Sequence, residues 1–156
     1  MKEIVTVTGP IAPEELGFCQ CHEHIAMSKG KSWYLNPALR IDDMAKSLEE
    51  VRRYKSCGGD SFIDAQPCGC NRMAEELRKL SVKSGVHIIA STGFHKLCFY
   101  PDSHWIHSIS EADLEEVFVR ELTTGMYTDA DCTYPSVQSS VKAGIIKTAY
   151  DTEELS

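Results

Sequence analysis

No stretch of the sequence approaches the roughly 18 consecutive apolar residues that a membrane-spanning helix needs. Basic residues are also scarce, since 16 Lys and Arg stand against 23 Asp and Glu and the net charge is −7. A chain that binds a nucleic-acid backbone usually carries a basic face. The amino terminus alternates in polarity and lacks the apolar core of a secretion signal. We therefore expect a cytoplasmic protein with neither a membrane nor a nucleic acid as partner.

The spacing Cys-x-x-Cys, which is typical of zinc sites and redox proteins, does not occur among the seven cysteines. Their odd number and the lack of a secretion signal argue against a disulfide framework. We expect reduced thiols, several of them buried as small apolar side chains. Internal repeats and low-complexity segments are absent as well.

What is present is the composition of an ordinary globular protein. Of the 156 residues, 42% are hydrophobic and 25% are charged, which is enough for one compact domain over residues 1–156. The polar stretch 125–142 is longer than we expect ahead of a strand, and only Pro135 punctuates it clearly. We interpret this stretch as an insertion or a disordered loop.

Hydrophobic periodicity predicts strands that alternate with helices. A short β segment is expected at 4–8. The expected strands that follow are 18–25, 61–65, 86–90 and 144–149, and the expected helices are 41–57, 71–84 and 111–124. Strands separated by helices imply a parallel sheet with right-handed crossovers. The fold class is therefore α/β, either an open doubly wound sheet or part of a closed (β/α) barrel.

The sharpest local feature is the segment 19–24, Cys-Gln-Cys-His-Glu-His. Side chains alternate along a regular strand, so Gln20, His22 and His24 would share one face and the cysteines and Glu23 the other. We expect His22 and His24 to be a metal-ligand pair, because neutral imidazole suits zinc and similar metals. The alternative is a structural metal module built from cysteines and histidines together, drawing also on Cys68 and Cys70.

Three further places carry candidate site residues. Lys147 lies in the apolar strand 144–149, although lysine is rarely buried. Burial lowers the pKa of an amine and leaves it able to form a Schiff base or to react with carbon dioxide, and the resulting carbamate is able to bridge two metals. The alternative is that Lys147 simply extends to solvent from a strand end. The aromatic segment 94–109 is a candidate pocket wall that begins with Phe94 and His95. Asp64 is a strand-end polar group or a support for the site.

Four blocks of sequence occur in one order. They are Thr-Val-Thr-Gly-Pro-Ile at 6–11 with Glu-Glu-Leu-Gly at 14–17 and His-Glu-His at 22–24; Phe-Ile-Asp-Ala at 62–65 with Gly69 and Arg72; Val-His-Ile-Ile-Ala-Ser-Thr-Gly-Phe at 86–94; and Ala-Gly-Ile-Ile-Lys at 143–147. Together they resemble the phosphotriesterase family of the amidohydrolase superfamily. The resemblance runs nearly from end to end.

This resemblance implies the N-terminal half of a (β/α)8 TIM barrel, with parallel strands one to four, their intervening helices and a short N-terminal β segment. It also implies a binuclear divalent metal centre, usually zinc. By this resemblance His22 and His24 bind the more buried metal, and a carboxylated Lys147 bridges both. The implied chemistry is a metal-bridging hydroxide that attacks a small-molecule ester, lactone or phosphotriester in a catabolic process.

The departures from the family pattern concern the rest of its site. The family's two later histidines and its aspartate correspond to positions beyond Lys147, so we expect this chain to be incomplete and inactive alone. Met73 stands where the family often has an acidic residue, and His95 stands where an aromatic residue is usual. The alternatives are a non-catalytic half-barrel that forms a homodimer, or the module of cysteines and histidines.

Overall fold

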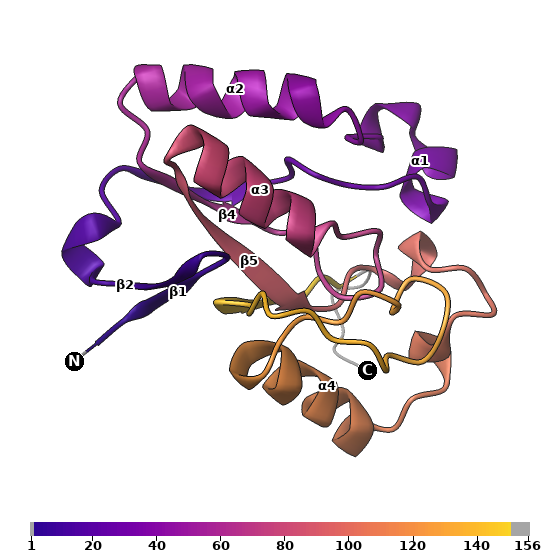
Figure 1. The fold of residues 1–156 in the computed structure, drawn as a ribbon. Coiled ribbons are helices and arrows are strands. Elements are labelled where there is room, and N and C mark those ends of the chain that lie inside the picture. The colour runs from indigo at the N-terminus through magenta and orange to yellow at the C-terminus, as the bar shows by residue number, and fades with distance from the viewer. Residues whose placement is uncertain (1, 151–156) are drawn as a thin grey trace.

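The computed structural model describes residues 2–150, which form a curled parallel sheet with helices along its outer face (Figure 1). Its four strands are hydrogen-bonded in chain order: β3 (Cys19–Glu23), β4 (Ser61–Asp64), β5 (His87–Gly93) and β6 (Ile145–Lys147). All three pairings are parallel. The expected half-barrel of four parallel strands is confirmed.

The long helices occupy the crossovers between these strands. They are α2 (Met44–Ser56), α3 (Ala74–Ser84) and α4 (Glu111–Thr123), while α1 (Lys31–Leu35) is a single short turn after β3. Helices α2 and α3 pack against each other, and α4 lies further round the curled sheet, against β5 (Figure 1). No helix within residues 2–150 is long and apolar enough to cross a membrane.

The hydrophobic core lies between the sheet and α2 and α3. Phe62 and Ile88 project from β4 and β5 and pack with Val51 of α2 and with Leu77 and Leu80 of α3. All five side chains are at most 4% exposed. Each is worth roughly 1.5–3 kcal/mol of burial free energy, so this layer fixes the positions of the strands.

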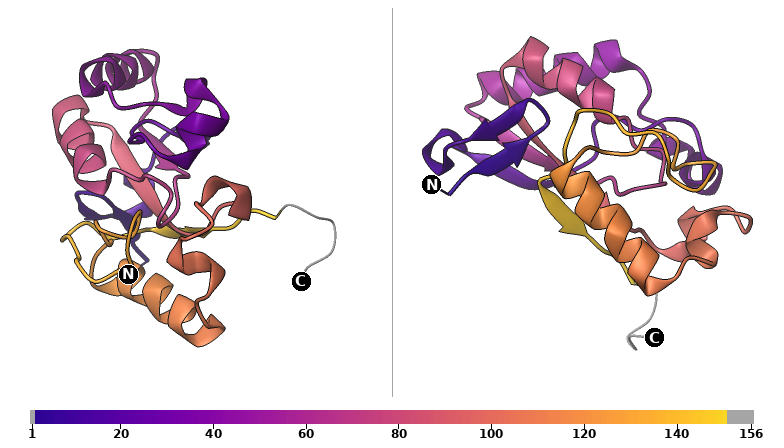
Figure 2. Two further views of the ribbon diagram at one scale, coloured as in Figure 1. Left: turned by 90° about the vertical axis from the view of Figure 1, so that its right-hand side faces the viewer. Right: turned by 60° about the horizontal axis from the view of Figure 1, so that its bottom comes forward.

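A β-hairpin made of β1 (Ile4–Thr6) and β2 (Gly9–Ile11) lies at the amino ends of the strands (Figure 2). The backbone N–H of Val7 donates to the carbonyl of Ile88, 2.9 Å away, near the start of β5. Val7 is itself buried in the core. The hairpin therefore belongs to the amino end of the half-barrel, opposite to the end where His24 and Lys147 lie.

The expected elements are present, with shifted ends. The carboxylate of Asp43 accepts from the N–H groups of Ala45 and Lys46 and so caps α2. Ser110 caps α4 in the same manner. Helix α3 begins at Ala74 rather than at 71 or 72, because Asn71 adopts a left-handed conformation at φ 62°. The short elements β2 and α1 were not predicted, nor were the 3-10 turns at Pro13–Glu15, Pro37–Leu39, Leu97–Phe99 and Trp105–His107.

The predicted alternation of side chains along 19–24 was wrong. The register between β3 and β4 shifts between Gln20 and Glu23, because three steps along β3 face only two along β4. This bulge places Gln20 and Glu23 on the same side of the strand, where the Gln20 amide donates to the Glu23 carboxylate. One extra residue in a strand reverses the alternation beyond it.

The stretch 125–142 is closed on itself by backbone hydrogen bonds. Met126 donates to the carbonyl of Val141 at 2.6 Å, and both side chains are at most 1% exposed. Tyr127 and Gln138 form an antiparallel bridge between the two arms. The carboxylate of Asp129 accepts backbone N–H groups at the far end of the stretch. Whether the stretch is an insertion stays a prediction.

Candidate metal centre

His22 and His24 lie side by side at the carboxyl end of β3. Their ring centroids are 5.3 Å apart and the ring planes meet at 66°. His22 is exposed and His24 is half-buried. The bulge that overturned the expected alternation lies between Gln20 and Glu23, and the two imidazoles nevertheless come together. In (β/α) barrels this end of the strands holds the active site.

The imidazole of His24 has unused hydrogen-bonding capacity. Its Nδ1 atom is buried and has no hydrogen-bond partner within the described residues. Burial lowers the pKa of His24, the neighbouring His22 and the more distant Lys147 lower it further, and a hydrogen bond with Gln66 opposes the shift. A neutral ring with a free nitrogen is the form of histidine that binds a metal.

Lys147 is the last residue of β6 and is half-buried at the same end of the sheet. Burial lowers the pKa of its amine, and the nearby Cys70 thiol works in the opposite direction. Its backbone carbonyl accepts from the N–H of Phe94 at 3.0 Å, which holds the end of β6 against the end of β5. Lys147 and His24 therefore lie at the ends of two different strands of one half-barrel, and the charge of Lys147 lowers the pKa of His24.

Asp64 ends β4 and its side chain is fully buried. Its carboxylate accepts from the backbone N–H of Ile25 at 3.0 Å and from that of Gln66 at 3.2 Å. Burial raises the pKa of Asp64 to about 7 against the lowering effect of these bonds. The carboxylate thus ties the residue after His24 to the turn after β4. Asp64 does not line the hollow that opens beside His24. Its supporting role for the site stays a prediction.

A small hollow of about 100 Å³ opens beside His24. Its walls are His24, Met27, Ser32, Leu39, Gln66, His95 and Phe99. His95 therefore lies where the sequence placed a pocket wall. Phe94 lies elsewhere, because its ring stacks at 6.4 Å on Phe118 of α4.

The donor groups fit a divalent metal of zinc type. The two imidazoles at one strand end could supply nitrogen ligands, and a carbamate formed on Lys147 would supply oxygen ligands in place of its amine. Within residues 2–150, no three histidine, cysteine or acidic side chains gather closely enough to hold a metal ion by themselves. Cys68 and Cys70 are buried, whereas Cys21 is exposed. The arrangement favours the histidine pair with Lys147 over the module of cysteines and histidines.

The sequence analysis gave no role to the ion pair between Arg72 and Glu121. The guanidinium and the carboxylate are 2.5 Å apart, with side chains 2% and 0% exposed. Arg72 also donates to the carbonyls of Ser91 in β5 and Tyr127 in the following segment. Burial disfavours the charged form of Glu121, but Arg72 keeps the pKa of that carboxyl below its usual value. The pair joins β5, α4 and the segment before β6, and so supports the strand that carries Lys147.

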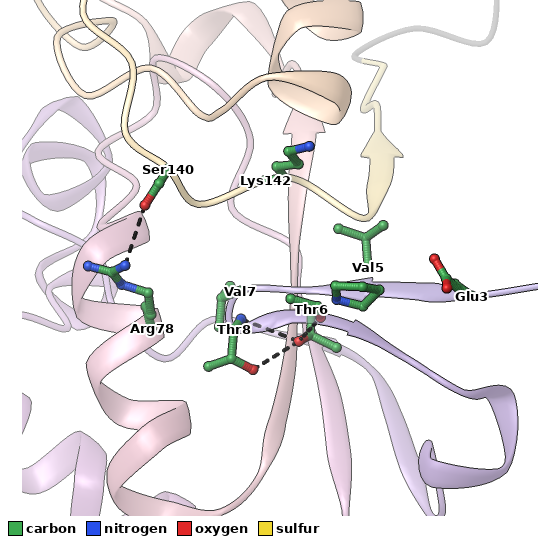
Figure 3. A pocket seen from close by; sticks show the side chains of 10 residues that line it. Glu3, Val5, Thr6, Val7, Thr8, Arg78, Ser140 and Lys142 are labelled. Carbon is green, nitrogen blue, oxygen red and sulfur yellow. Dashed lines mark hydrogen bonds between the residues drawn. The ribbon is translucent and has the colours of Figure 1, made fainter.

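A cavity of about 410 Å³ lies at the opposite end of the sheet, between the β1–β2 hairpin, α3 and the segment before β6 (Figure 3). Arg78 and Lys142 lie on its walls, and the Arg78 guanidinium donates to the hydroxyl of Ser140 at 3.4 Å. None of the candidate metal ligands lines it. In (β/α) barrels this amino end usually serves stability rather than catalysis.

Comparison with known sequences relates the chain to one family of hydrolases. The sequence model of the phosphotriesterase family matches residues 2–156. The phospho-furanose lactonase of Mycoplasmopsis agalactiae is 30% identical over 150 residues, which cover 94% of this chain and 42% of that protein. The N-acetyltaurine hydrolase of Rattus norvegicus is 28% identical, with coverage of 92% and 46%.

Solved structures agree with the sequence matches. An amidohydrolase from Mycoplasma synoviae superposes with a TM-score of 0.85 at 28% identity, covering 93% of this chain and 42% of the other. A lactonase from Listeria monocytogenes gives a TM-score of 0.77 at 27% identity, with coverage of 93% and 46%. The chain thus spans less than half the length of each of these four relatives.

Proposed function

Because this chain belongs to the phosphotriesterase family, we propose that it carries the first half of a metal-dependent hydrolase site. In this proposal His22, His24 and Lys147 hold a divalent metal, zinc in the first instance, at the carboxyl ends of β3 and β6. The chain spans less than half the length of its relatives, so the complete activity is proposed for a protein of their length. We expect the 156-residue chain alone to be inactive.

The single observation that carries the proposal is the pair of imidazoles at the end of β3. Their rings are 5.3 Å apart, and one buried ring nitrogen of His24 has no hydrogen-bond partner in the described chain. An orphaned polar atom in a buried position is costly, and native structures rarely leave one without a reason. A bound metal would satisfy it.

Each residue has a distinct part in the proposed chemistry. When bound, a divalent metal polarises the electrophile and lowers the pKa of water. His22 and His24 orient the ion at the end of β3 through neutral nitrogen atoms. Burial lowers the pKa of the Lys147 amine, and its unprotonated form would add carbon dioxide with release of a proton, which gives carbamate oxygens at the end of β6. Asp64 keeps the turn after His24 in place through the N–H of Ile25.

The substrate we propose is a small ester or lactone, with a phosphotriester as the alternative. Two relatives carry the names phospho-furanose lactonase and N-acetyltaurine hydrolase. In both names the bond that is cleaved belongs to a carbonyl group, which favours a carbonyl centre over a phosphorus centre. The walls of the hollow beside His24 include Phe99 and Leu39, which suit the carbon skeleton of such a molecule.

Zinc titration of the purified chain tests this proposal. We expect tight binding that is lost when His22 and His24 are both replaced by Asn. His87 provides the matched control, because it lies at the amino end of β5. Replacement of His87 by Asn should leave binding unchanged. Equal binding by the His22→Asn/His24→Asn variant would refute the proposal.

A homodimer is a second proposal, and the sheet edges favour it. Within the described residues β3 pairs only with β4, and β6 pairs only with β5, so two parallel edges lack partners. Ile146 in β6 is 53% exposed. Two copies related by a two-fold axis would place β6 of one beside β3 of the other and close an eight-stranded barrel. Native mass spectrometry in dilute solution checks this, and a stable monomer would contradict it.

The cytoplasmic location stays a prediction.

A further inference from the structure

The cavity at the amino end of the sheet carries two cationic side chains that the proposed metal centre does not use. Arg78 extends into its wall from α3, and Lys142 does so from the segment before β6. Among the described residues that line the cavity, Glu3 is the only carboxylate. The chain as a whole is acidic, with a net charge of −7, so this cavity departs from the charge of its surroundings.

The guanidinium of Arg78 is held in place from two sides. It forms an ion pair with Glu75, one turn earlier in α3, at 2.7 Å. It also donates to the hydroxyl of Ser140 at 3.4 Å. Because the Ser140 oxygen accepts this bond, the proton of its own hydroxyl is left to donate to another group. Arg78 and Ser140 thus present donors from one side of the cavity (Figure 3).

Lys142 adds a second cation to these donors. Its side chain is exposed, and it forms no ion pair with any other residue in the range 2–150. In Figure 3 it lies between the pair of Arg78 and Ser140 on one side and Glu3 on the other. The lone carboxylate is therefore remote from Arg78. A guanidinium, a hydroxyl and an ammonium group are together the donors that suit the oxygens of a phosphate group.

The volume and the remaining wall of the cavity indicate what else the ligand contains. The cavity measures about 410 Å³, which lies within the range of roughly 300–1,000 Å³ that is typical of small-molecule sites. A phosphate group would occupy only part of this space. Val5 and Pro10 of the β1–β2 hairpin form an apolar part of the wall, which suits a small organic group.

We propose that this cavity binds a small phosphate monoester. The phosphate oxygens accept from Arg78, Ser140 and Lys142, and the organic group lies against Val5 and Pro10. The bound molecule would join the hairpin, α3 and the segment before β6. The site is independent of the proposed function, because its residues lie at the other end of the sheet from the candidate metal ligands.

NMR titration of the full chain with phenyl phosphate, in a chelator, tests the proposal. The chelator removes any metal to which a phosphate could bind. We expect the backbone signals of the hairpin and of residues 140–142 to shift in a saturable manner, while those of residues 22–24 stay unchanged. Phenyl phosphate should bind more tightly than inorganic phosphate, since its ring contacts Val5 and Pro10. Added salt should weaken both, because it screens the cations.

Three variants separate a specific site from general attraction between charges. Lys142→Met should weaken the binding of phenyl phosphate about 3-fold to 10-fold, as expected for a charge-assisted hydrogen bond at a partly exposed position. Lys83→Met is the matched control, because Lys83 is exposed on the same helix as Arg78 but does not line the cavity. It removes the same charge and should leave the affinity unchanged. Glu3→Gln removes the carboxylate and should tighten binding.

The proposal would be overturned if the signals of the hairpin and of residues 140–142 did not shift in the folded wild type. Equal weakening by Lys142→Met and Lys83→Met would also overturn it, because binding would then follow net charge alone. Equal affinity for phenyl phosphate and inorganic phosphate would refute the contact between the organic group and the apolar wall. If Lys142→Met does not fold, the wild-type shifts and the affinity of Glu3→Gln decide.

Discussion

Replacement of Asp64 by Asn should change how the stability of the chain depends on pH. Asn resembles the protonated acid in shape and keeps one oxygen that can accept from Ile25. The wild-type carboxyl is fully buried, and burial raises its pKa from 3.8 to about 7. The variant has no group at this position that titrates, so the difference between the two proteins isolates the contribution of Asp64.

The sign of the pH dependence follows from the raised pKa of Asp64 in the folded protein. Between pH 3.8 and about 7 the folded protein binds a proton at Asp64 that the unfolded chain has released. The contribution of Asp64 to the free energy of unfolding is therefore fully present below about pH 4 and is lost as pH rises through about 7. A shift of about three pKa units corresponds to about 4 kcal/mol.

Urea unfolding of both proteins in a chelator, at several pH values from about 4 to about 8, measures this. We expect the wild type to lose about 4 kcal/mol relative to Asp64→Asn over that range. Asp102→Asn, at an exposed position, is the control and should follow the wild type. The reasoning would be refuted if the free energy of unfolding of the wild type, relative to that of Asp64→Asn, stayed constant or increased as the pH rises.

Two further stability predictions follow from close contacts near the strand that carries Lys147. Glu121→Leu leaves the buried Arg72 guanidinium without its partner and should lower the free energy of unfolding in urea by about 3–5 kcal/mol. The double variant Arg72→Met/Glu121→Leu should recover most of this loss. Equal losses in the single and the double variant would contradict the pairing. Gly85→Ala, where φ is 71° and nothing lies within 4 Å, should cost about 1–2 kcal/mol. Gly93→Ala should cost clearly more, since its Cβ would meet the Lys147 carbonyl at 1.9 Å, and a loss no larger than that of Gly85→Ala would contradict this.

Much of the fold could be predicted from the sequence because the spacing of the apolar residues indicates which side chains are buried. The strands and long helices follow from apolar runs, and their ends follow from local chemistry. Ser110 begins α4 by accepting the N–H of Asp113, and Gly85 ends α3 in a left-handed conformation at φ 71°. Such signals lie within a few residues of the feature that they specify.

The features that sequence reasoning missed depend on contacts between distant segments. The bulge in β3 exists only relative to the register of β4, so no property of 19–24 alone reveals it. The ion pair joins Arg72 to Glu121, 49 residues away. Helix α1 has five residues, too few for a helical period to be visible. The residue types of the site could be predicted from the sequence, whereas the hydrogen bonds by which Asp64 joins Ile25 to Gln66 exist only in the folded turn.

X-ray absorption at the zinc edge of the zinc-loaded chain tests the central claim most directly, because it identifies the atoms bound to the metal. The account predicts nitrogen and oxygen neighbours at about 2.0–2.2 Å, supplied by His22, His24 and a carboxylated Lys147. It also predicts that the nitrogen signal falls when the two histidines are replaced by Asn. Sulfur neighbours at about 2.3 Å would instead assign the metal to the cysteines and contradict the account.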